Sequence, residues 1–93
     1  MNTNSKRDYM KKNLTYAEAT DGLNEIISNL GFPLFMGEAK AKPTMRSLRS
    51  KVKAYYTSLN KENRLDVLHA YDAQSKAELV ENALVEMLER VEG

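Results

Sequence analysis

The chain has 93 residues, of which 42% are hydrophobic and 29% are charged; this suits one globular domain with a single shared core. It contains no cysteine, which excludes disulfides, thiolate metal sites and thiol catalysis. No apolar run approaches the roughly 18 residues that span a bilayer, and the basic start leads into no apolar segment typical of a signal peptide. We therefore expect a cytoplasmic protein without a membrane span.

The formal net charge of +1 hides a difference between the two parts of the chain. Residues 1–59 contain ten Lys and Arg against five Asp and Glu, whereas residues 60–93 contain four against eight. Such polarity can be neutralised within the fold, across a head-to-tail dimer, or by an outside partner.

The first predicted helix covers residues 16–30 and follows a polar start. Residues 1–13 are polar and rich in Asn and Lys, and they are expected to be a flexible N-terminus. Thr15 and Glu18 have the spacing of a capping box, in which each side chain accepts a hydrogen bond from the backbone N–H of the other. Apolar residues then recur at steps of three and four, as on one face of a helix: Tyr16, Ala19, Leu23, Ile26, Ile27 and Leu30.

A connection of about a dozen residues, 31–42, is expected next. Gly31 is predicted to close the helix, and Pro33 to prevent its continuation. The connection contains four large apolar residues: Phe32, Leu34, Phe35 and Met36. The simpler interpretation is that they close the open end of the helical core. The alternative is an exposed loop that binds a partner through residues such as Phe32 and Phe35, because a contiguous apolar surface usually marks an interface.

The remainder of the chain has the pattern of three more helices, at residues 44–59, 61–72 and 75–91. Their apolar residues recur at steps of three and four. Asn60 and Ser75 are suited to cap the second and third of these helices. The sequence therefore predicts an all-α fold, a compact small bundle of about four helices that forms a single domain over residues 14–93.

Groups typical of catalytic or metal sites are scarce. His69 is the single histidine, and no recognisable nucleophile motif surrounds any serine. The four glycines are scattered, so no phosphate-binding loop is formed. We expect no enzyme activity, no metal and no cofactor.

One cluster of charge stands out between residues 40 and 53, where six Lys and Arg occur without any Asp or Glu. Four of them step by four, three and four residues and so share one side of a helix; we call them the basic stripe: Lys42, Arg46, Arg49 and Lys53. A one-sided basic helix suits phosphates or an acidic protein surface. The alternative is a solvated face that is partly neutralised by the acidic last helix.

The segment VKAYYTSL, residues 52–59, begins at the end of this region and also has the composition of a short strand, followed by two helices. That order resembles the ribbon-helix-helix DNA-binding family over residues 51–88. The resemblance implies that Lys53, Tyr55 and Thr57 would enter the major groove. The unbroken helical period from Met45 to Leu59 favours a helix instead.

Two functions remain open on these grounds. The first is a non-enzymatic interaction protein, such as a small helical regulator, inhibitor or immunity-type protein, that binds another protein through an acidic or apolar surface of that partner. The alternative is a DNA-binding regulator that uses the basic segment 40–53. A homodimer is compatible with either function.

Overall fold

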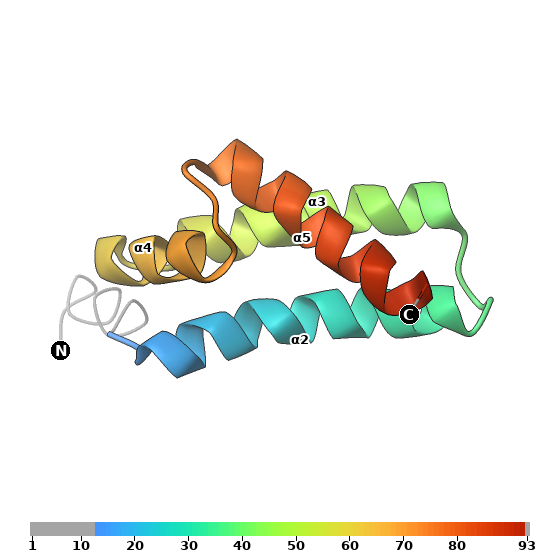
Figure 1. Cartoon of the computed structure of the whole chain (residues 1–93), viewed down its shortest axis with the longest axis horizontal. Helices are drawn as coiled ribbons and strands as arrows, with labels where there is room; N and C mark the ends of the chain where they lie inside the picture. Colours follow the sequence, from blue (N-terminus) through green and yellow to red (C-terminus); the bar gives the residue numbers. More distant parts are fainter. Residues whose placement is uncertain (1–12, 93) are drawn as a thin grey trace, which may run out of the picture.

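The computed structural model describes residues 13–92, and these residues form four helices (Figure 1). The helices are α2 (Tyr16–Phe35), α3 (Ala41–Ser58), α4 (Lys61–Ala70) and α5 (Lys76–Glu92). The prediction of an all-α bundle is therefore confirmed. The expected flexible N-terminus lies, apart from Asn13, outside the described residues.

The four helices share one core. α2 and α3 run in opposite directions, and α5 crosses this pair and contacts both helices (Figure 1). α4 packs mainly on α2. The buried hydrophobic side chains come from every helix and from the residue that ends α3: Ala19, Leu23, Ile27, Leu48, Val52, Leu59, Val67, Leu68, Leu79, Val80, Ala83, Leu84 and Met87. None of the described helices has the length and apolar character needed to cross a membrane.

The predicted helix starts at Thr15, Asn60 and Ser75 are confirmed. The Thr15 Oγ1 accepts from the Glu18 N–H at 3.0 Å, and the Glu18 carboxylate accepts from the Thr15 N–H at 2.9 Å. The side chain of Asn60 caps α4 by accepting from the third residue of that helix, and Ser75 caps α5 in the same way. Each cap satisfies a first-turn N–H that has no partner within its helix.

The predicted end of the first helix is wrong, because α2 continues through Gly31 and Pro33 to Phe35. The glycine that closes it is Gly37, whose φ of 76° lies in the left-handed region. The Glu38 N–H donates to the Pro33 carbonyl and the Gly37 N–H to the Leu34 carbonyl, which is the pattern of a Schellman motif. Pro33 has no N–H to donate to the Asn29 carbonyl, and its ring crowds that carbonyl; the helix continues for only two residues beyond it. The connection is correspondingly shorter, and α3 begins at Ala41, three residues earlier than predicted.

The corner between α4 and α5 uses a second Schellman motif without glycine. Asp72 occupies the left-handed position with a φ of 52°, a conformation that aspartate tolerates better than most residues. The Ala73 N–H donates to the Leu68 carbonyl at 2.8 Å, and the Asp72 N–H donates to the His69 carbonyl at 3.1 Å. Asn82 of α5 donates to the carbonyls of Tyr71 and Asp72 and so ties the corner to α5.

A buried amide fixes the chain before α2. The Asn63 side chain, which is 1% exposed, accepts from the Leu14 N–H at 2.9 Å and donates to the Leu14 carbonyl at 2.8 Å. It also donates to Asp66 at 3.0 Å. These bonds satisfy the amide fully, as burial requires, and they set where α2 enters the bundle.

Candidate functional site

The C-terminal end of α2 is held against α5 by a close helix contact. Gly31 is buried, and a Cβ placed on it would lie 3.2 Å from Met87 Cγ. The absence of a side chain at this position therefore lets α5 approach. Gly31 therefore serves the packing of α2 against α5, whereas the sequence predicted that it would end the helix.

Three large apolar side chains at this end of α2 are exposed. Phe32 is 64% exposed, Phe35 is 58% exposed and Met36 is 52% exposed; we call these three residues the aromatic patch. Leu34, which lies between them, packs against the core. The interpretation that these residues close the core is thus correct for Leu34 and wrong for the three others. They also belong to the end of a helix and its C-cap, where a loop was predicted.

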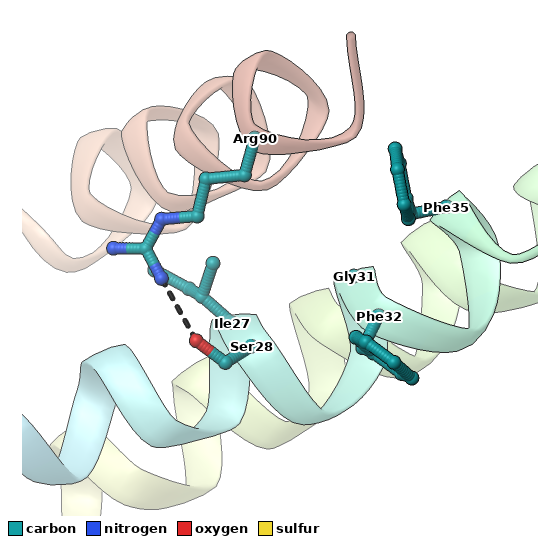
Figure 2. A pocket seen from close by; sticks show the side chains of 6 residues that line it. All are labelled: Ile27, Ser28, Gly31, Phe32, Phe35 and Arg90. Atoms are coloured by element: carbon teal, nitrogen blue, oxygen red, sulfur yellow. Dashed lines mark hydrogen bonds between the residues drawn. The ribbon is translucent and has the colours of Figure 1, made fainter. Parts of the chain in front are cut away.

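An open hollow of about 330 Å³ lies beside the aromatic patch (Figure 2). It is lined by residues of α2 and by one residue of α5: Ile27, Ser28, Gly31, Phe32, Phe35 and Arg90. Apart from Ser28 and Arg90 its lining is apolar. Gly31 forms part of the wall of the hollow, and the rings of Phe32 and Phe35 project from the end of α2.

Arg90 fixes one edge of the hollow. Its guanidinium donates to Ser28 Oγ and Asn24 Oδ1 of α2, both at 2.9 Å, and pairs with Glu86 of its own helix at 3.0 Å. Asn24 Oδ1 also accepts from the Tyr71 hydroxyl at 2.6 Å. The network therefore joins the loop after α4 to α2 and α5. Arg90 could not be recognised as important from the sequence, because a single Arg in an acidic helix is usually an ordinary solvent-exposed residue.

A second, polar hollow of about 430 Å³ has Asn24 in its lining. Tyr16, Thr20, Tyr71 and Asn82 contribute to its lining. Burial, together with the charge of Glu86, raises the pKa of Tyr71 to about 12, although Arg90 acts in the opposite direction. Two of the hydrogen-bonding groups here are already engaged within the protein: Thr20 Oγ1 donates to the Tyr16 carbonyl, and Asn82 donates to the Tyr71 carbonyl.

The basic stripe lies on α3, as predicted. Lys42, Arg46 and Lys53 are exposed, and Arg49 is half-buried. Within residues 13–92 the stripe has one ion pair, from Arg49 to Glu81 of α5. Neutralisation by the acidic last helix therefore applies to Arg49, while the other three cations face solvent.

The alternative of a strand in this region is wrong. Lys51 through Ser58 continue α3 without a break, because Leu48, Val52 and Leu59 follow the helical period and all face the core. Lys53, Tyr55 and Thr57 therefore do not share one face as they would in a strand. Tyr55 turns inward and donates to the Ala19 carbonyl at 2.7 Å.

Within residues 13–92, no group of three or more His, Asp or Glu side chains could hold a metal ion. His69 is exposed and meets the ring of Tyr16 edge-on, with 6.4 Å between ring centroids. No protein-family model, curated protein or solved structure matches this chain. The candidate sites are accordingly the aromatic patch with its hollow, and the exposed side of α3.

Proposed function

We propose that this chain is a non-enzymatic interaction protein of the cytoplasm that binds another protein through the aromatic patch. The observation that carries the proposal is the exposure of Phe32, Phe35 and Met36 beside an apolar hollow. Large aromatic side chains next to a concave apolar surface are typical of the centre of a protein interface. The cytoplasmic location rests on the lack of cysteine in the chain.

Rigidity of this surface supports the proposal. The aromatic rings stand on the last turn of a helix, and that helix is closed by the Gly37 turn and anchored by Leu34 in the core. Arg90 and its bonds to Asn24 and Ser28 hold the opposite edge. A surface that is already ordered loses little conformational freedom on binding, which favours affinity. We infer that the partner places an apolar side chain in the hollow between Phe35 and Arg90.

The proposal is tested by comparing the proteins retained by the wild-type chain with those retained by the double variant F32S/F35S. Both rings are largely exposed, so the variant should stay folded and lose less than about 1 kcal/mol of stability. The matched control is L65S/V85S, which removes two similarly exposed apolar side chains from α4 and α5. A partner retained by the wild type and the control, but lost by F32S/F35S, is the expected result.

Two results would count against this proposal. A partner that F32S/F35S retains as well as the wild type does would contradict the proposal. Sedimentation at several protein concentrations distinguishes a second copy of this chain from a different partner. A dimer that F32S/F35S dissociates would identify the aromatic patch as a self-association surface, in place of a site for another protein.

A further inference from the structure

The outward side of α3 has an unusual arrangement of small and basic residues. The helix buries Thr44, Leu48 and Val52, and the opposite side therefore faces away from the bundle. The side chains along the middle of that outward side are small: Pro43, Ser47, Ser50, Ala54 and Thr57. We call these five residues the small-residue strip.

Cations border this strip on both edges. One edge is the basic stripe. The other edge contains Lys51 and, at the N-cap, Lys40. Lys51 follows Lys42 by nine residues, or two and a half turns, so their side chains leave opposite edges of the helix. No Asp or Glu occurs between residues 39 and 61, and Glu81 of α5 pairs with Arg49 alone of these cations.

From this arrangement we propose that α3 binds the phosphate backbone of duplex nucleic acid, lying along a groove with its small-residue strip inward. An α-helix is about 10–12 Å across with its side chains, and the major groove of B-DNA is about 12 Å wide. Small side chains along the centre permit close approach. The cations on both edges then reach the phosphates on both sides of the groove, where they displace counterions.

The composition of this surface favours a nucleic acid over an acidic protein. Protein interfaces are depleted in lysine and depend on aromatic or aliphatic anchors, whereas the outward side of α3 has three exposed lysines along its length and no large apolar side chain: Lys42, Lys51 and Lys53. Lysine serves readily as a point charge for phosphate. The residue types on this surface therefore suit the phosphate backbone of a nucleic acid.

Duplex is favoured over single strand because α3 presents no free aromatic ring for stacking. Binding of single strands uses bases stacked on aromatic side chains. Tyr55 is directed into the bundle by its bond to Ala19, and the Tyr56 ring lies under the Arg64 guanidinium at 5.9 Å. The strip also contains no Asn or Gln for base recognition. Binding should therefore have little sequence preference.

The test is a salt titration of the full chain against a random-sequence duplex, followed by fluorescence anisotropy. Of the six Lys and Arg between residues 40 and 53, all except Arg49 are free to contact a phosphate. Five such contacts should lower the binding constant about 500-fold between 50 and 200 mM salt. K42Q/K53Q should reduce this loss to about 40-fold. The matched control K61Q/K76Q removes the same charge from the starts of α4 and α5 and should behave as the wild type. Thermal melting of each variant confirms that it is folded.

Four outcomes would overturn the proposal. The first is no duplex binding at 50 mM salt. The second is equal weakening by K42Q/K53Q and by the control pair, which would indicate net charge alone. The third is unchanged binding by K42Q/K53Q, which would assign any binding to cations elsewhere, including those of residues 1–12. The fourth is competition by polyglutamate as effective as that by duplex, which would indicate an acidic protein partner. F32S/F35S should leave duplex binding unchanged, so this proposal and the proposed function fail separately.

Discussion

The hydroxyl group of Tyr55 on α3 occupies the space where a side chain at Gly22 on α2 would begin. It donates to the Ala19 carbonyl at 2.7 Å, and a Cβ placed on Gly22 would lie 2.7 Å from Tyr55 Cζ and closer still to the hydroxyl oxygen. Glycine costs about 1 kcal/mol relative to alanine inside a helix. At this position that cost is offset by the inward docking of a tyrosine from the neighbouring helix.

We therefore expect Gly22→Ala to destabilise the protein, although alanine is the better helix former. Overpacking of this kind typically costs about 1–3 kcal/mol. In a Tyr55→Ala background the same substitution should become neutral or stabilising by up to about 1 kcal/mol, since the conflict is gone. Urea denaturation of the four proteins measures this coupling. A Gly22→Ala variant more stable than the wild type would show that α2 and α3 do not approach as described.

Asn63 gives a second prediction, because its buried amide bonds both backbone groups of Leu14. Asn63→Ala leaves those two groups unpaired, and each unsatisfied buried group costs about 1–3 kcal/mol. Asn63→Asp keeps the shape but loses the donor to the Leu14 carbonyl and places a carboxylate beside Asp66.

The measurement is the free energy of unfolding of both variants at pH 7 and pH 4. Asn63→Asp should be destabilised at pH 7 and should recover part of its stability, relative to Asn63→Ala, as the carboxylates become protonated at lower pH. Equal pH dependence of the two variants would contradict the close approach to Asp66.

Tyr71 predicts a loss of stability at high pH. Its pKa is raised to about 12, chiefly by burial, whereas an unfolded tyrosine titrates near 10. Between these values the unfolded chain releases the proton and the folded chain retains it, so the stability that this group contributes is full below about pH 10 and is lost as the pH rises toward 12. Tyr71→Phe should show a shallower decline over that interval in denaturant unfolding. Parallel curves for the two proteins would contradict this prediction.

The helical class of the fold and most helix starts could be predicted from the sequence, because the interactions that determine them are local. The caps at Asn60 and Ser75 depend on side chains that reach only three residues along the chain. The end of α2 could not be predicted in the same way. Glycine commonly ends a helix, but the role of Gly31 is set by its contact with Met87, 56 residues away. Phe32 and Phe35 lie outside the core, which no local pattern indicates.

The candidate sites also differ in whether local or long-range contacts determine them. The basic stripe follows from helical spacing, so its four residues lie where they were expected. Which of its cations is neutralised depends on how α5 crosses α3, and the crossing places Glu81 at Arg49. The hollow beside the aromatic patch depends on Arg90, whose partners Asn24 and Ser28 lie more than 60 residues away in the chain. Contacts between residues so far apart in the chain cannot be predicted from a local sequence pattern.

The last prediction separates Arg49 from Arg46, which sequence spacing alone places on the same stripe. Arg49 pairs with Glu81 across the contact between α3 and α5, while Arg46 is exposed and has no ion pair within the described part of the chain. Exposed ion pairs contribute about 0–1 kcal/mol. Arg49→Glu should therefore destabilise the protein slightly more than Arg49→Gln, because it places two carboxylates together, and Arg46→Glu should match Arg46→Gln.

The reversal R49E/E81R provides the decisive comparison, because it restores an opposite-charge pair with the positions exchanged. Its melting temperature should exceed the value expected from adding the effects of the two single substitutions. Added salt should reduce this difference, since the pair is solvent-exposed and screened. If the effects of R49E and E81R simply add, Arg49 and Glu81 do not interact in solution, and Arg49 then belongs with the free cations on the exposed side of α3.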